Sequence, residues 1–253
     1  MANNYYSGQG SVSASERDPL TGAPLGFIDI GNVPELEISI ETTKFEHKES
    51  ESGSRAVDLS IVQEKKGTFR MLVENISLEN LAMGFWGTTV STTAVTAEAL
   101  VVVAPLDFTL GKNTLPIGAV NVSNVLVGTA AGLSDHTVDV DYTLDPKYGT
   151  ITVLEAGGII AGSDIHITYD TIAATDSVIA FTQDSLERYI RFEGLNTIAG
   201  TGDVLINMYK VQLDPLSGYN LINEELAQIE LTGSVLYDDK QLGASKFFEQ
   251  IDV

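Results

Sequence analysis

The chain has 253 residues, 35 acidic and 14 basic side chains, a formal net charge of −21 and 43% hydrophobic residues. So few cations exclude a groove that grips nucleic-acid phosphates, which requires clustered Lys and Arg. The lack of cysteine excludes a disulfide framework, a thiolate metal site and a cysteine nucleophile. The composition indicates an acidic globular protein without an enzymatic activity.

The first 34 residues carry no periodic pattern and are expected to form an N-terminal arm. The prolines of Asp18-Pro19 and Ala23-Pro24 disfavour a helix. Residues 1–15 lack the basic start and apolar stretch of a signal peptide. The arm is either a disordered tail or a segment that becomes ordered against a partner.

The next segment predicts a long β-hairpin with a charged tip. In Glu35–Thr43 and in Arg55–Val62, apolar and polar residues alternate with the period of two that is typical of half-buried strands. The charged residues between them, Lys44–Ser54, are expected to form the tip. The apolar positions should face the core, and they are Leu36, Ile38, Ile40, Val57, Leu59 and Ile61.

One helix is predicted directly after the hairpin. Leu78, Leu81, Ala82 and Phe85 have helical spacing, Ser77 is a good N-cap, and Gly87 follows the expected end.

Residues 91–174 differ in amino-acid composition from the segments on either side and are expected to form an inserted β domain. The segment is rich in Val, Thr, Ile, Gly and Ala, and short strand candidates alternate with turn signals. This pattern predicts a small, Ig-like β-sandwich. The predicted strands are Ala99–Val103, Val122–Val127, Tyr142–Leu144, Thr150–Leu154 and Ile165–Tyr169.

Longer strands return after the insertion, so residues 35–90 and 175–253 are expected to form one core domain. Strands are predicted around Ile190–Gly194, over Val204–Leu213 and over Ala227–Tyr237. The C-terminal segment Phe247–Val253 shows no clear element. The predicted fold class is therefore mainly β, a barrel or sandwich core with one flanking helix and an inserted small sandwich.

No motif in the sequence predicts catalysis or a cofactor. There is no G-x-S-x-G elbow and no phosphate-binding P-loop. Asp139, Asp141 and Asp145 do not meet the requirements of a calcium-binding EF-hand loop. The three histidines are far apart in the sequence. We expect no enzyme, no cofactor and no metal site.

The sequence resembles the major tail tube proteins of long, non-contractile phage tails. Six stretches carry the resemblance, in the same order as in that family. They are GNVPELEISIE (31–41), KFEHKESESGSRAVDLSI (44–61), NISLENLAMGFWG (75–87), DYTLDPKYGTITV (141–153), YIRFEGLN (189–196) and MYKVQLDP (208–215).

The resemblance implies a virion protein, assembled in the host cytoplasm, whose copies form rings, usually of six, that stack into a hollow tail tube. The inserted domain would lie on the outside of the tube. The implied partners are other copies of the chain, a tape-measure protein and double-stranded DNA in the lumen, and terminator and distal tail or baseplate proteins at the ends. No membrane is involved.

Two sets of residues are candidates for functional roles in such a tube, one in contacts between rings and one in lining the lumen. The mixed charges of the hairpin tip suit a polar contact between rings, and these residues are Lys44, Phe45, Glu46, His47, Lys48, Glu49, Glu51 and Arg55. Carboxylates on the polar faces of the hairpin strands would repel DNA phosphates in a lumen. These carboxylates are Glu35, Glu37, Glu41 and Asp58.

Two other functions remain open at this point. A capsid decoration protein or a minor tail protein would share the composition. A carbohydrate-binding or other ligand-binding β-sandwich is a second alternative, although Trp86 is the only tryptophan and no aromatic cluster suited to sugar stacking is evident.

Overall fold

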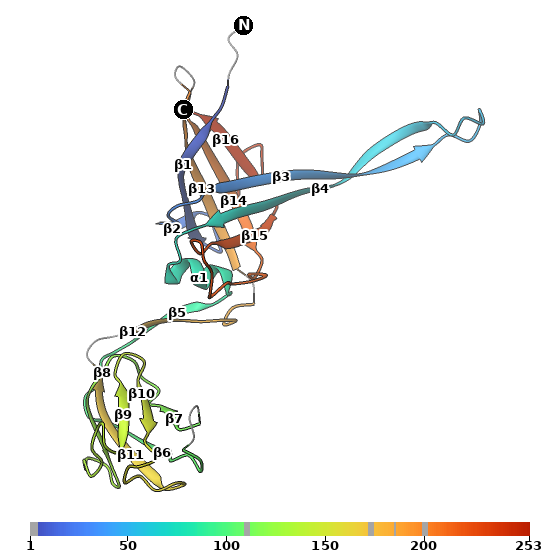
Figure 1. Cartoon of the computed structure of the whole chain (residues 1–253). Helices are drawn as coiled ribbons and strands as arrows, with labels where there is room; N and C mark the ends of the chain where they lie inside the picture. The colour runs from blue at the N-terminus through green and yellow to red at the C-terminus, as the bar shows by residue number, and fades with distance from the viewer. Residues whose placement is uncertain (1–4, 109–111, 172–174, 185, 199–201) are drawn as a thin grey trace. The chain divides into compact units, whose positions relative to one another are not determined.

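The computed structural model describes residues 5–108, 112–171, 175–184, 186–198 and 202–253. The chain forms two compact units, one made of Met1–Thr89 with Val178–Val253 and the other of Val90–Ser177. The described chain is mainly β with one short helix, which confirms the predicted fold class (Figure 1).

The first unit is built around one antiparallel sheet of eight strands. The strand order is β2-β1-β13-β14-β15-β4-β3, and β16 pairs with β14 beside β15. The strands are β1 (Gly8–Arg17), β2 (Pro24–Asp29), β3 (Glu35–Lys48), β4 (Val57–Val73), β13 (Leu186–Asn196), β14 (Val204–Leu213), β15 (Ile229–Val235) and β16 (Phe248–Asp252).

Side chains from the two halves of this sheet share one core. Along β15, buried and half-buried positions alternate, as expected for a sheet with one covered face. Leu36 and Ile38 of β3 pack on the same cluster as Phe192 and Ile206 of β13 and β14, so the sheet curls around the core. The members that are at most 2% exposed are Val12, Ile30, Phe69, Met71, Val73, Leu186, Ile190, Met208, Val211, Leu213, Ile229 and Leu231.

Both ends of the chain contribute strands that the sequence pattern does not predict. The proposed arm contains β1 and β2, and β1 pairs with β13 from Gly8↔Asn196 to Ser15↔Tyr189. A disordered tail over residues 5–34 is therefore wrong; residues 1–4 lie outside the described part. The segment 247–253 contains β16, which pairs with β14. The partners of β1 and β16, namely β13 and β14, lie at least 40 residues away along the chain, so no local pattern predicts these two strands.

The predicted helix is present as α1 (Leu78–Gly84). Ser77 caps it by accepting a hydrogen bond from the backbone N–H of Asn80 at 3.2 Å. Trp86 follows with φ of 49°, packs against the core and donates from Nε1 to the carbonyl of Leu213 at 3.1 Å. No helix in the described part of the chain is long and apolar enough to cross a membrane.

Asn80 is fully buried, and its side chain ties α1 to two loops. Its Nδ2 donates to the carbonyls of Ile30 (2.9 Å) and Asn75 (2.8 Å). We expect Asn80→Leu to lower the free energy of unfolding of this unit by about 1 kcal/mol, because the carbonyls of Ile30 and Asn75 each lose a hydrogen bond, while Nδ2 of Asn75 still donates to the carbonyl of Ile30. Urea unfolding followed by Trp86 fluorescence measures the change. Glu79→Gln on the exposed side of α1 should change it little, and equal effects of the two variants would contradict the assignment.

The second unit contains two three-stranded sheets around its own core, as the pattern predicts. One has the order β7-β10-β9 and the other β6-β11-β8. Their strands are β6 (Glu98–Val103), β7 (Thr114–Pro116), β8 (Val122–Gly128), β9 (Tyr142–Asp145), β10 (Thr150–Val153) and β11 (Asp164–Thr171). A further pair, β5 (Thr88–Thr92) and β12 (Thr175–Ile179), forms a two-stranded sheet where the chain passes from one unit to the other.

Asp141 and Asp145, which were compared above with a calcium-binding loop, accept hydrogen bonds from backbone N–H groups of this unit. Asp141 accepts hydrogen bonds from the backbone N–H groups of Thr137 (2.7 Å) and Gly158 (2.5 Å). These two bonds lower the pKa of Asp141. Asp145 accepts from the N–H groups of Lys147 and Tyr148 in the turn before β10. In that turn Gly149 has φ of 61°, and a Cβ there would overlap the carbonyl oxygen of Ala119.

Candidate functional site

The hairpin of β3 and β4 extends far beyond the strands that flank it. Pairing of β4 with β15 ends at Gly67↔Val235, whereas β3 and β4 continue to pair as far as Lys48↔Val57. At about 3.3 Å per residue, the ten residues from Gly67 to Val57 correspond to about 30 Å of two-stranded ribbon. Figure 1 shows this ribbon projecting from the rest of its unit. We call residues 44–62 the hairpin arm.

The hairpin differs from its sequence prediction in two respects. Residues 44–48 belong to β3, so the tip is confined to the turn between Lys48 and Val57. Four of the six apolar positions do not face the core: Ile40 is 66% exposed, and Val57, Leu59 and Ile61 are each about half exposed. Both corrections have one cause: the arm runs past the end of the core, so an alternating pattern continues where the chain has nothing to pack against.

One face of the hairpin arm is apolar. Partners across an antiparallel ladder point to the same face, and Phe45 pairs with Ile61 while His47 pairs with Leu59. Phe45 is 48% exposed, and Leu59 and Ile61 are each 50% exposed. A two-stranded hairpin is marginally stable in water unless something covers it. The arm therefore has the character of a surface that another molecule covers.

Glu49 organises the turn at the end of the arm. Its carboxylate accepts hydrogen bonds from the backbone N–H groups of Glu51 (2.8 Å) and Ser52 (2.9 Å). The hydroxyls of Ser52 and Ser54 donate to its other oxygen at 2.5 and 2.8 Å. These bonds, with the Ser52 hydroxyl as the largest contributor, lower the pKa of Glu49 to about 2.

We expect the turn to keep its structure in mild acid. Because the pKa of Glu49 is lower in the folded turn than its ordinary value of 4.5, the stabilisation is complete above pH 4.5 and is lost as the pH falls through about 2. An NMR titration of the side-chain carboxyl carbon of Glu49 should have its midpoint near pH 2. A midpoint in the ordinary glutamate range would contradict the hydrogen-bonded turn.

The residues predicted to contact a neighbouring ring lie together on the arm but not on one face. Phe45 and His47 point to the apolar face and Glu46 to the other, whereas Lys44 and Lys48 each follow a shift in the register and pair with Val62 and Val57. The other three belong to the turn, namely Glu49, Glu51 and Arg55. His47 lies against Asp58, with Nδ1 and Oδ1 at 2.6 Å. Their role in a ring contact remains a prediction.

The structure brings together three of the four predicted lumen carboxylates. Glu35, Glu37 and Glu41 share one exposed face of β3, and Asp58 lies apart on the arm. This face is not purely acidic. Arg70 of β4 pairs with both Glu230 and Glu35, and Lys66 lies opposite Glu41. The sequence alone does not place these cations here, because only the strand register brings them among the carboxylates.

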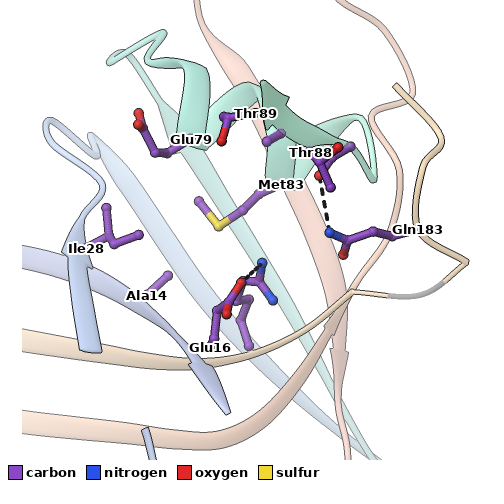
Figure 2. Close-up of a pocket in the computed structure, with 11 residues that line it drawn as sticks. Ala14, Glu16, Ile28, Glu79, Met83, Thr88, Thr89 and Gln183 are labelled. Carbon is purple, nitrogen blue, oxygen red and sulfur yellow. Dashed lines mark hydrogen bonds and ion pairs between the residues drawn. The ribbon is translucent and has the colours of Figure 1, made fainter. Parts of the chain in front are cut away.

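A cavity of about 310 Å³ lies in the same unit between α1, β1 and β2 (Figure 2). Ala14, Ile28 and Met83 provide apolar wall, and Glu16 forms an ion pair with Arg188 at 3.3 Å. Burial lowers the pKa of Arg188, and the charge of Glu16 partly offsets this effect. The two charges neutralise each other, and none of the lining residues is a histidine.

Within the described residues, no group of three His, Asp or Glu side chains is arranged to hold a metal ion. The family model described as "Protein of unknown function UCP028589" matches residues 5–251, and the chain belongs to this family. No curated protein matches the chain.

Proposed function

We propose that the chain is a structural subunit that assembles with copies of itself into stacked rings of a hollow tube, of the kind that forms phage tails. The observation that carries the proposal is the hairpin arm, which holds half-exposed Phe45, Leu59 and Ile61 on one face. Large side chains held away from the core are a liability in a monomer, but they stabilise an assembly that buries them.

The edges of the sheet support the same proposal. β2 and β3 are the edge strands of the sheet, and β16 pairs with β14 along one of its two edges. Leu25, Phe27 and Ile28 of β2 are exposed beside such an edge. Open strand edges in natural proteins are usually protected or paired. Pairing with neighbouring copies would satisfy their backbone groups and cover these side chains.

The charge of the chain fits the role of a conduit. With −21 charges per subunit, a ring of several copies repels DNA phosphates and does not retain a passing genome. The β3 face with Glu35, Glu37 and Glu41 is the proposed lining. Because Lys66 and Arg70 lie among these carboxylates, we expect a lining of moderate negative charge.

Electron microscopy of the purified protein over a range of concentrations, together with sedimentation velocity, tests the proposal. Rings or tubes are the expected result. A compact trimer would favour a capsid decoration protein, and a monomer at all concentrations would overturn self-assembly. Mass spectrometry of virions that carry this gene should find the chain as an abundant component.

A further inference from the structure

We propose that the loop between β14 and β15 of one copy docks in a groove at the root of the β3–β4 hairpin of a second copy. This inference rests on the proposed function and names one contact by which copies stack end to end. The groove is apolar with a cationic wall, and the loop is apolar and acidic.

The groove lies where β3 and β4 leave the rest of the sheet, and its volume is about 170 Å³. Its apolar wall consists of Ile40, Val235, Phe247 and Phe248. Ile40 is 66% exposed, although its strand partner Gly67 still pairs with β15. Since an apolar cavity of about 150 Å³ takes a benzene-sized group, the groove has room for one large aliphatic side chain.

The charged side chains that line the groove are Lys65 and Lys66, and no carboxylate lines it in the part of the chain that the structure describes. Lys65 pairs with Thr42, two residues beyond Ile40, so it shares the face of Ile40. Glu41 lies opposite Lys66 and offsets part of its charge, which leaves Lys65 as the cation beside the apolar wall. The groove therefore fits an aliphatic side chain that is accompanied by a carboxylate.

The loop between β14 and β15 carries this combination at residues 221–226. Glu224 and Glu225 are exposed there, and residues 211–239 contain no Lys or Arg that would neutralise them within their own segment. Three large apolar side chains accompany them and are 78%, 97% and 80% exposed, namely Leu221, Ile222 and Leu226. No other segment of the described first unit has two large apolar side chains that are each more than 70% exposed. Ile222, the most exposed of the three, is the side chain assigned to the groove.

Both ends of the loop are anchored to the body of the unit. Leu216 donates its backbone N–H to the carbonyl of Gly84 at 2.8 Å. At the other end, Nε2 of Gln228 donates to a carboxylate oxygen of Glu74 at 3.0 Å. These contacts hold the loop at one end of the unit.

The groove lies at the other end of β15. The loop leads into Ile229 at the start of this strand, whereas Val235 at its end lines the groove. The strand between these two residues spans about 20 Å. Contact therefore involves a second copy, stacked along the direction of β15. Each copy then donates a loop and receives one, as a head-to-tail assembly requires.

Cross-linking tests the docking, because the chain has no native cysteine. Ile222→Cys and Thr42→Cys proteins are purified separately, mixed under assembly conditions and treated with a short bismaleimide. The expected product is a dimer with one copy of each protein. It should be roughly tenfold more abundant than from Ile222→Cys mixed with Thr43→Cys, because Thr43 pairs with Glu64 on the opposite face of the hairpin.

Charge reversal tests the electrostatic part of the contact. Glu224→Lys with Glu225→Lys places cations against Lys65 and should raise the concentration needed for assembly by about tenfold or more. Each replacement changes the charge by two, so the net charge of a subunit falls from −21 to −17, which by itself favours association. Adding Lys65→Glu should recover most of the loss. The same reversal at Glu98 and Glu155 of the second unit should not raise the concentration.

Circular dichroism and Trp86 fluorescence establish that each variant is folded. Tubes that form at wild-type concentrations from the charge-reversed loop, or tubes without a cross-link between positions 222 and 42, would overturn the docking and leave self-assembly standing. Failure of the wild-type chain to assemble would overturn both.

Discussion

Replacing Leu59 and Ile61 together by glutamate is expected to prevent assembly while the monomer stays folded. Covering the exposed halves of these two side chains contributes about 2 kcal/mol to association, and burying two carboxylates in their place costs several more. The concentration required for assembly should therefore rise by about a hundredfold or more. Sedimentation velocity over a dilution series measures the shift.

The matched control changes the other face of the same strand. Ser60→Glu adds one carboxylate opposite Glu46 and leaves the apolar face intact, so assembly should shift by less than about tenfold. Circular dichroism and Trp86 fluorescence must show native folding for both variants. If Leu59→Glu with Ile61→Glu still forms tubes at wild-type concentrations, the apolar face of the arm is not an assembly surface.

Sequence patterning predicts those parts of the fold in which each strand has one covered face. The pattern predicts a strand over Val204–Leu213, and β14 has the same bounds in the structure. The same alternation extends through Val57, Leu59 and Ile61, but there it describes a face that this chain leaves half exposed. A period of two reveals that a strand has an apolar face, and it carries no information on which molecule covers that face.

Sequence patterning does not predict strands that contain few large apolar residues. The sequence of β1 is GQGSVSASER, in which Val12 and Ala14 are the only apolar residues, yet both are buried. What makes this segment a strand is its pairing with β13, about 180 residues away along the chain. Tertiary pairing of this kind outweighs local propensity, and a single sequence holds no trace of it.

The same distinction between local sequence pattern and tertiary structure applies to the candidate surfaces. The sequence shows the mixed charge of the hairpin arm directly. The exposure of Leu59 and Ile61, and the place of Lys66 and Arg70 among the carboxylates of β3, depend on the strand register and on which residues the core leaves uncovered. The role proposed for this chain depends on uncovered surface, which only the folded chain defines.

A buried ion pair that joins the two ends of the first unit gives the largest expected change in stability. Arg17 on β1 contacts Asp238 at 2.6 Å and Glu187 at 3.1 Å, and the side chains of Arg17 and Asp238 are only 9% and 2% exposed. Arg17→Met leaves a buried carboxylate without its cation. We expect the free energy of unfolding to fall by about 3–5 kcal/mol, measured by urea unfolding with Trp86 as the probe.

The pH dependence of this loss distinguishes it from simple loss of packing. Burial alone would raise the pKa of Asp238, but hydrogen bonds from Gln241, the backbone of Lys240 and Arg17 outweigh burial and lower it. In the wild type this contribution is complete above the ordinary aspartate range and declines as the pH falls through the lowered pKa. Without Arg17 the folded-state pKa of Asp238 is higher, so the variant loses less stability than the wild type on acidification, and the difference between the two should be largest above the ordinary aspartate range and shrink in acid. Lys240→Met removes the cation of an exposed pair and should cost less than about 1 kcal/mol, with no such pH dependence. Equal losses from the two variants would show that the buried pair does not hold β1 to the segment after β15.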